Sequence, residues 1–274
     1  MKRRKMTAAA CCLMITAVLS LSACGGRQAA SVVIAGSTSV QPYVEVLAEE
    51  YARLRPDSVI DIQGGGSSAG ITAVESDTAH IGMSSRNLKE SERHLWKAEI
   101  AKDGLAIIVH PSNPVENLTR GQLRDVYTAD VTNWSQLGGP DARIHIIARE
   151  EGSGTRSAFD DLVMAERRIA HGAIVQDSNG AVRQLVADDP YSIGFISLGL
   201  VDLGERPVKV VRIDGVAPTR ESVLDAEYPL YRSFLFVAKE EPVGPARQFL
   251  DFIFSEAGRR LLTDEGLVAE DWIE

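Results

Sequence analysis

The chain has 274 residues with 29 basic and 38 acidic side chains, so its formal net charge at pH 7 is −9. A nucleic-acid-binding protein would present a basic face, and this chain has no basic segment beyond its first residues, so that class is excluded. The cysteines are Cys11, Cys12 and Cys24, which leaves the body of the chain without a thiol for a disulfide, a metal or a nucleophile.

The N-terminus has the pattern of a secretory signal. A basic start and a mostly apolar stretch to Leu19 precede the tetrapeptide LSAC, which ends at Cys24. This tetrapeptide resembles the lipobox of bacterial lipoproteins, in which the cysteine is acylated and becomes the mature N-terminus. An uncleaved membrane anchor is the alternative, but the apolar stretch is shorter than the roughly 20 residues that span a bilayer. We expect a signal peptide over 1–23, lipid on Cys24 and a tether over 24–30.

Three times along the chain, an apolar strand-like run ends in glycine and small hydroxyl residues, and a helix pattern follows at once. The glycine-hydroxyl turns are Gly36-Ser37-Thr38-Ser39, Gly64-Gly65-Gly66-Ser67-Ser68 and Glu151-Gly152-Ser153-Gly154-Thr155. Glycine lets the backbone approach a ligand closely, and the unpaired N–H groups and partial positive charge of a helix start favour an anion. Three such turns predict that several helix starts point at one oxyanion.

Strand and helix patterns alternate along the rest of the chain. Further strands are predicted near 79–83, 105–109, 192–197, 208–213 and 231–238, and helices near 40–51, 69–74, 118–127, 158–163, 182–186 and 249–262. This alternation predicts an α/β protein with mostly parallel sheets, and the length favours two sheets over one.

We expect two lobes, because about 250 residues follow the signal peptide and can bury a large core. The first lobe is predicted to be discontinuous, over 31–109 and 231–274. The second lobe is predicted over 110–230. The chain would then cross between the lobes near His110 and near Tyr231.

The segment from Arg149 to Arg156 combines the donors that a tetrahedral oxyanion requires. Ser153 and Thr155 can donate hydroxyl hydrogens, Gly154 and Thr155 can donate backbone N–H groups, and Arg149 can donate a planar fork. Because the whole chain is acidic, such local donors would have to overcome its repulsion of anions. The alternative is an ordinary helix cap with two surface arginines, and this segment alone leaves both interpretations open.

Together with five other stretches, this segment resembles the phosphate-binding receptors of bacterial high-affinity phosphate ABC importers. The other stretches are Gly36–Val40, Gly65–Gly70, Ile81–Arg86, Asp177–Val182 and Ile193–Phe195. The resemblance runs from about Ile34 to the C-terminus. It implies a two-lobed type II periplasmic-binding fold with a hinged cleft, inorganic phosphate as the ligand, an ABC permease with its ATPase as partners, and no catalytic activity, cofactor or metal.

The resemblance also implies which residues bind the anion. Direct contacts are expected from Ser37, Thr38, Ser67, Arg149, Ser153, Gly154 and Thr155, with Ser85 and Arg86 beside them. Some members of the family place an aspartate where this chain has Ser85, and that carboxylate accepts the proton of phosphate. A serine cannot repel fully ionised sulfate in the same way, so sulfate and molybdate stay alternative ligands.

Three other classes of function remain open. Residues 66–70 fit the Gly-x-Ser-x-Gly elbow of hydrolases with Ser68 as nucleophile, although the histidines are scattered. Residues 64–69 fit a loose dinucleotide loop, but the acidic residue expected about 20 positions further on is missing. A structural surface lipoprotein is the last alternative. We expect a monomer in the cell envelope, anchored by its lipid and facing the periplasm or the exterior.

Overall fold

The computed structural model describes residues 30–202, 204 and 206–267. The predicted signal peptide, the lipid site at Cys24 and most of the tether lie outside these residues. None of the helices in the described ranges combines the length and the hydropathy of a segment that could cross a bilayer.

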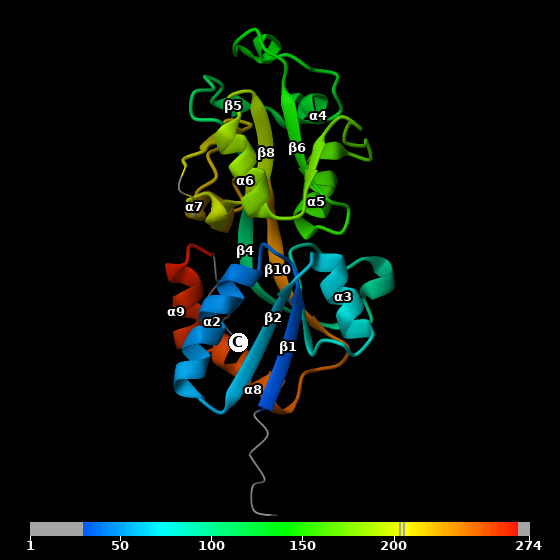
Figure 1. Cartoon of the computed structure of the whole chain (residues 1–274), viewed down its shortest axis with the longest axis vertical. Helices are drawn as coiled ribbons and strands as arrows, with labels where there is room; N and C mark the ends of the chain where they lie inside the picture. The colour runs from blue at the N-terminus through cyan, green and yellow to red at the C-terminus, as the bar shows by residue number, and fades with distance from the viewer. Residues whose placement is uncertain (1–29, 203, 205, 268–274) are drawn as a thin grey trace, which may run out of the picture. The chain divides into compact units, whose positions relative to one another are not determined.

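A mixed β-sheet runs through the described residues (Figure 1). Its strands are β1 (Ala30–Gly36), β2 (Ser58–Gly64), β3 (Ile81–Ser84), β4 (Trp96–Val109), β5 (Asn117–Leu118), β6 (His145–Arg149), β7 (Ile174–Gln176), β8 (Ser192–Ser197), β9 (Lys209–Ile213) and β10 (Tyr231–Ala238). The main path runs in the order β2-β1-β3-β10-β4-β8-β6-β7, with β9 paired to β4 and β5. The α-helices are α2 (Gln41–Leu54), α3 (Ser67–Glu75), α4 (Arg120–Tyr127), α5 (Gly154–Phe159), α6 (Asn179–Asp188), α7 (Arg220–Leu224), α8 (Gly244–Ile253) and α9 (Glu256–Asp264).

The directions of the strands correct one prediction from the sequence. Strands β1 and β3 pair in parallel, as do β6 and β8, but β10 is antiparallel to both β3 and β4, and β4 is antiparallel to β8. The prediction of two mostly parallel sheets was therefore wrong. One sheet results because β4 is long enough to pair first with β10 and then with β8. Its first part, from Trp96, was missed because polar and apolar residues are mixed there.

Helices cover both faces of this sheet, which explains the apolar runs in its strands. On β4, Leu105, Ile107 and Val109 pack in one core cluster with residues of α4 and α5, whereas Ala106 and Ile108 pack in another with residues of α6. On β10, Phe234 and Phe236 pack with residues of α2 and α8, and Leu235 and Val237 pack with residues of α3.

The core divides along β4 and β10. Ile100 and Ala101 belong to the cluster around α2 and α8, which we call the first core, whereas Leu105 begins the cluster around α4 and α5, the second core. On β10 the change falls between Tyr231, which packs against the second core, and Phe234, which belongs to the first. The sheet thus has a first half (β2, β1, β3, β10 and the start of β4) and a second half (the end of β4, β8, β6, β7 and β9). The division into two lobes stays a prediction, and the core contacts favour a first crossing near Gly104 over one at His110.

Candidate functional site

The turn after β1 brings small hydroxyl residues to the edge of the first sheet half. Gly36 has φ of +137°, and a Cβ there would lie 2.3 Å from the carbonyl oxygen of Met83 on the neighbouring strand β3, so only glycine fits. The N–H of Ser37 donates to that same carbonyl, at 2.9 Å. Ser37 and Ser39 are consequently held in a buried turn just before α2 begins.

Two other turns end at the same place, because the carboxyl ends of parallel strands meet at one edge of a sheet. Ser85 follows β3, and its hydroxyl accepts a hydrogen bond of 2.8 Å from the hydroxyl of Ser37. The N–H of Ser85 donates to Oγ of Ser67, the first residue of α3, at 3.0 Å. All three serines are buried.

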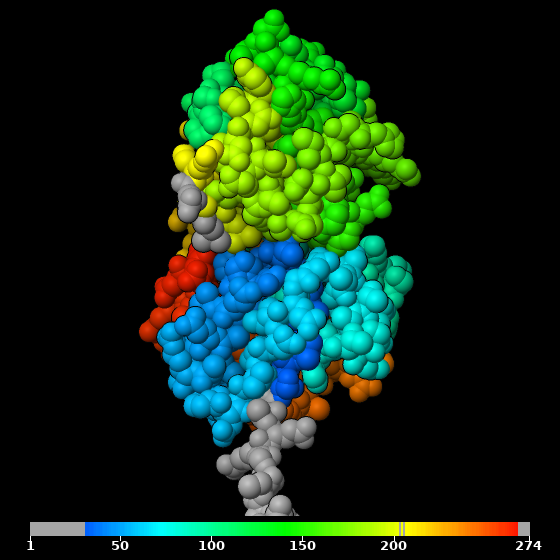
Figure 2. Space-filling model, in the orientation of Figure 1, coloured from blue at the N-terminus to red at the C-terminus, as the bar shows by residue number. Residues whose placement is uncertain are grey.

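The second sheet half contributes the turn between β6 and α5. Ser153 is the N-cap of α5, and its hydroxyl accepts from the N–H of Arg156 at 3.2 Å. At Gly154, a Cβ would lie 2.2 Å from Oγ of Ser67 and 2.4 Å from Oγ of Ser85, so the backbone there contacts both serines directly. Oγ1 of Thr155 lies 2.8 Å from Oγ of Ser39. We call Ser37, Ser39, Ser67, Ser85 and Thr155 the hydroxyl cluster. Figure 2 shows that blue and cyan atoms of the first sheet half lie against green and yellow-green atoms of the second.

Arg149 ends β6 and lies beside this cluster, with 1% of its surface exposed. Its Nη2 donates to Oγ1 of Thr38 at 3.2 Å, as well as to Glu150 and a backbone carbonyl. Its Nη1 is buried and has no hydrogen-bond partner among the residues that the structure describes. A buried donor without a partner costs free energy, more so when the group is charged. This nitrogen is therefore a position where an anion would be stabilised.

Arg86 has a different environment, although it too is almost completely buried. Its Nη1 and Nη2 donate to the two carboxylate oxygens of Glu92 at 2.7 and 2.8 Å, and Nη1 also donates to a backbone carbonyl. The hydrogen bond from Arg86 holds the pKa of Glu92 below its ordinary value. These partners occupy the guanidinium, and only a long contact of 3.5 Å to Ser68 faces the α3 turn.

The structure adds residues that the sequence reasoning did not single out. Nδ2 of Asn179 donates to Oγ of Ser39 at 2.9 Å, and Nη2 of Arg232 donates to the same oxygen at 3.2 Å. Arg232 also forms a buried ion pair with Asp103. Asn179 lies in Asp177–Val182, one of the stretches that carried the resemblance, so the sequence could have indicated it as a site residue. Asp103 and Arg232 had none, since only strand pairing brings them together.

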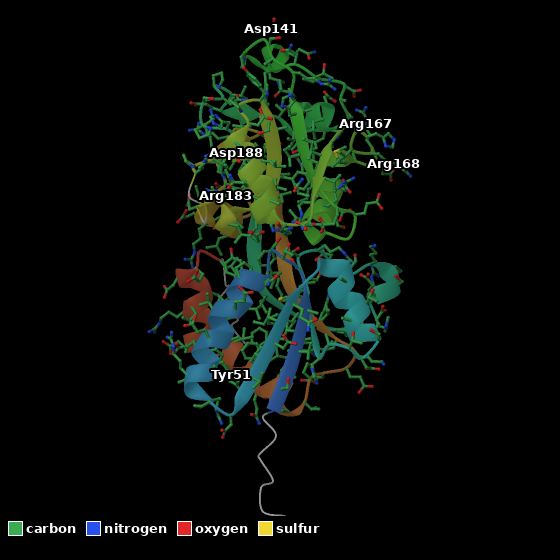
Figure 3. The ribbon with its side chains drawn as sticks, viewed as in Figure 1. Tyr51, Asp141, Arg167, Arg168, Arg183 and Asp188 are labelled. Atoms are coloured by element: carbon green, nitrogen blue, oxygen red, sulfur yellow. The ribbon has the colours of Figure 1, made fainter. Side chains whose placement is uncertain are left out.

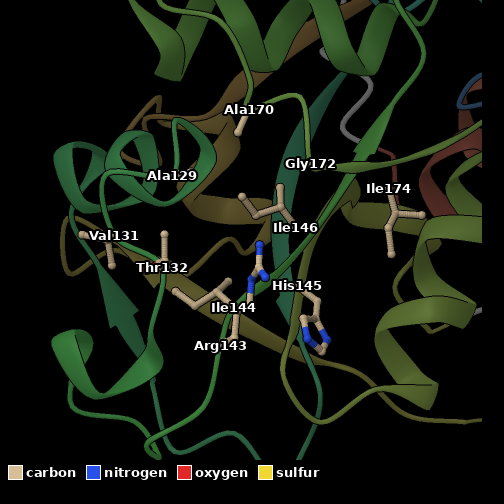
Figure 4. Close-up of a pocket in the computed structure, with 10 residues that line it drawn as sticks. All are labelled: Ala129, Val131, Thr132, Arg143, Ile144, His145, Ile146, Ala170, Gly172 and Ile174. Atoms are coloured by element: carbon tan, nitrogen blue, oxygen red, sulfur yellow. The ribbon is translucent and has the colours of Figure 1, made fainter.

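Of two hollows in the described structure, one borders this site and the other lies apart from it. One, of about 240 Å³, borders the site, because Thr38, Ser178, Asn179 and Gly180 are among the residues that line it. The other, of about 290 Å³, is lined by residues of the second sheet half such as Arg143, His145 and Ile174 (Figure 4). The ring of His145 lies 2.6 Å from the carboxylate of Asp189. This second hollow shares no residue with the predicted site.

The geometry bears on metal binding and on the hydrolase alternative. In the described ranges, no group of three or more His, Cys, Asp or Glu could hold a metal ion. Ser68, the nucleophile of the hydrolase interpretation, donates its N–H to the carbonyl of Gly152, and its hydroxyl contacts Arg86 rather than a base. A Ser-His pair, which that interpretation needs, is therefore not formed by the contacts of Ser68.

Comparisons with known proteins identify the family of this chain. Residues 22–257 match the family described as PBP superfamily domain. The phosphate-binding protein PstS of Bacillus subtilis is 32% identical over 247 residues, which cover 88% of this chain and 81% of that protein.

Solved structures extend the similarity. A putative phosphate ABC transporter substrate-binding protein of Clostridium perfringens, with bound phosphate, is 42% identical with a TM-score of 0.84, over 88% of this chain and 100% of that one. An ABC-type phosphate transport receptor of Vibrio cholerae is 38% identical with a TM-score of 0.74, over 87% and 100%. The predicted α/β periplasmic-binding fold is confirmed, and the chain belongs to the PBP superfamily and, within it, to the family of the PstS phosphate-binding proteins.

Proposed function

We propose that this protein is an extracytoplasmic receptor that binds inorganic phosphate between its two lobes and delivers it to an ABC importer. The observation that carries the proposal is the buried Nη1 of Arg149, for which the described residues supply no partner, beside hydroxyls from both sheet halves. The relatives support the same ligand, since they are named for phosphate binding and one contains bound phosphate.

The donors available at this site suit a small tetrahedral anion. Arg149 supplies charge, and Thr38, Ser67 and Thr155 supply hydroxyls, with the backbone of Gly154 between them. Ser37 donates its hydroxyl hydrogen to Ser85, which leaves the hydrogen of Ser85 for the anion. Charge-assisted hydrogen bonds contribute roughly 1.5–3 kcal/mol each, and micromolar affinity requires about 8 kcal/mol. A few such bonds therefore suffice without a metal ion. In this assignment Arg86 stabilises the loop to Glu92 and is not a main donor. Ser153 accepts the N–H of Arg156 as the cap of α5 and keeps its hydroxyl hydrogen for the anion.

Binding and closure follow from the same contacts. With the first crossing moved from His110 to about Gly104, the first lobe would comprise about 31–104 and 231–274, and the second about 105–230. Because donors come from both lobes, the anion stabilises the closed arrangement more than an open one. Direct contacts such as Ser39 to Thr155 and Ser68 to Gly152 hold the lobes together when they close.

The N-terminal sequence pattern supports a membrane location for the receptor. In this proposal, residues 1–23 are a signal peptide that is removed, and lipid on Cys24 anchors a monomer to the cell envelope. The permease and its ATPase are then the partners that receive the phosphate. Mass spectrometry of the protein isolated from membranes tests the anchor, because a Cys24→Ser protein should lose both the lipid mass and the membrane fraction.

Isothermal titration calorimetry of the chain from Gly25 onward tests the ligand, with phosphate, arsenate, sulfate and molybdate in turn. We expect phosphate to bind at least tenfold more tightly than sulfate or molybdate, and small-angle scattering to show compaction when phosphate is added. If sulfate binds as tightly as phosphate, the protein is a receptor for tetrahedral oxyanions in general and not for phosphate in particular. Binding of none of the four would overturn the receptor function.

A further inference from the structure

A buried ion pair links the two strands that pass between the cores. Arg232 on β10 and Asp103 on β4 are register partners (β4 and β10 are labelled in Figure 1). Nε and Nη2 of Arg232 donate to Oδ2 of Asp103 at 3.0 and 2.8 Å, while the hydroxyl of Ser197, at the end of β8, donates to Oδ1 at 2.7 Å. Both oxygens of the carboxylate therefore accept hydrogen bonds, Oδ2 from a donor in the first sheet half and Oδ1 from a donor in the second.

Arg232 also reaches the hydroxyl cluster. Its Nη2 donates to Oγ of Ser39, which accepts a second hydrogen bond from Nδ2 of Asn179. The orientation of the Asn179 amide is determined by its other end, since Oδ1 accepts from the N–H of Ser197 at 3.2 Å. Both donors to Ser39 are thus groups that can only donate.

These bonds determine the direction of the next one. A serine hydroxyl has two acceptor positions and one hydrogen. Since Arg232 and Asn179 occupy both acceptor positions of Ser39, its hydrogen must be donated to Oγ1 of Thr155, 2.8 Å away. Thr155 accepts that bond and keeps its own hydrogen for another acceptor. A chain of hydrogen bonds with one direction is also polarised along its length, which strengthens the last donor.

We propose that Asp103 and Arg232 are positioning residues that orient the hydroxyl of Thr155 as a donor to the bound anion. This inference rests on the proposed function, in which Thr155 contacts phosphate. Without the pair, Ser39 could accept from Thr155 instead, and Thr155 would then present a lone pair to the anion. Because this series of hydrogen bonds includes residues of β4, β10 and β8, it also connects the anion to the strands between the lobes.

A double-mutant cycle tests the inference, with phosphate affinity measured by calorimetry. Arg232→Lys keeps the charge but cannot donate to Asp103 and Ser39 in the same fork. We expect it to weaken phosphate binding about tenfold in the wild-type background and less than about twofold in a Thr155→Val background, since coupled residues give non-additive effects. Equal losses in both backgrounds would overturn the inference while leaving phosphate binding intact. If wild-type protein binds no phosphate, the proposed function and this inference fall together.

Two further variants separate positioning from folding. Arg183 on α6, labelled in Figure 3, is buried to the same degree as Arg232, with 5% exposed, and its partners are backbone carbonyls such as that of Val201. Arg183→Lys should lower thermal stability but leave phosphate affinity unchanged. Ser39→Ala leaves the Arg232–Asp103 pair intact and repeats the cycle if Arg232→Lys does not fold. A loss with Ser39→Ala that persists in the Thr155→Val background counts against the inference.

Discussion

The loop that carries Arg149 (149–155) and the loop that carries Arg86 (84–92) have much in common. Each follows a strand of the sheet, each contains small hydroxyl residues, and both arginines are at most 3% exposed. Both guanidinium groups also donate to the two oxygens of a carboxylate, that of Glu92 for Arg86 and that of Glu150 for Arg149. They differ in one respect: Arg149 keeps a buried nitrogen, Nη1, for which no described residue is a partner. Burial alone therefore does not distinguish an arginine that binds a ligand from one that stabilises a loop. The distinction comes from whether each guanidinium nitrogen has a hydrogen-bond partner within the protein.

Replacing each arginine by methionine tests this comparison most strongly. We expect Arg149→Met to weaken phosphate binding at least about 100-fold, because it removes the charge and about two charge-assisted hydrogen bonds at roughly 1.5–3 kcal/mol each. Arg86→Met should change affinity less than about threefold and instead lower the melting temperature, since Glu92 loses its partner. Calorimetry and thermal unfolding measure the two effects. Similar losses of affinity in both variants would contradict the comparison.

Within the Arg149 loop, two glycines form a matched pair. We expect Gly154→Ala to weaken phosphate binding about tenfold and to abolish compaction in scattering, because its Cβ would lie within 2.4 Å of Ser67 and Ser85, and overpacking costs about 1–3 kcal/mol. At Gly152, a Cβ would have no atom of the described structure within 4 Å, so Gly152→Ala is the control. If Gly154→Ala shows the same compaction in scattering as wild type, the backbone at Gly154 need not contact Ser67 and Ser85 for closure.

In the Arg86 loop, Ser85 can be converted to aspartate, which adds a carboxylate at the hydroxyl cluster. We expect Ser85→Asp to raise the preference for phosphate over sulfate about tenfold, because a carboxylate accepts a proton from phosphate and repels fully ionised sulfate. Ser85→Asn has the same shape without the charge and controls for the added volume. The test is the ratio of the phosphate affinity to the sulfate affinity in each variant, measured by calorimetry at pH 7. An unchanged ratio in Ser85→Asp would mean that its carboxylate does not face the anion.

The smallest effect concerns the ion pair that occupies Arg86. The pKa of Glu92 is lower in the folded state than its ordinary value of 4.5, so its ionisation stabilises the fold at pH above that value. This contribution is lost as the pH falls through the lower, folded-state pKa. We expect Glu92→Gln to reduce the free energy of unfolding at pH 7 and to differ less from wild type near pH 3. Denaturant titrations at several pH values measure this, and a difference that does not vary with pH would argue against the ion pair.

The sequence predicted the parts of the site that depend on local chemistry. Strands that end in glycine and hydroxyl residues before a helix were found at Gly36, Gly66 and Gly154, because turn conformation and helix starts depend on a few neighbouring residues. The resemblance carried by these turns identified the family and the fold. The order of elements followed for the same reason, since apolar runs and helical spacing are visible in short windows.

Only the tertiary structure decided how these parts are paired. That β4 joins both sheet halves, that Asp103 lies opposite Arg232, and that Asn179 and Arg232 both donate to Ser39 are contacts between residues far apart in the chain. The difference between Arg149 and Arg86 has the same origin. A sequence states which donors and acceptors exist, but the partner of each buried group depends on the three-dimensional packing of strands and loops, because desolvation favours pairing and only the packing decides which group is left without a partner, as Nη1 of Arg149 is among the described residues.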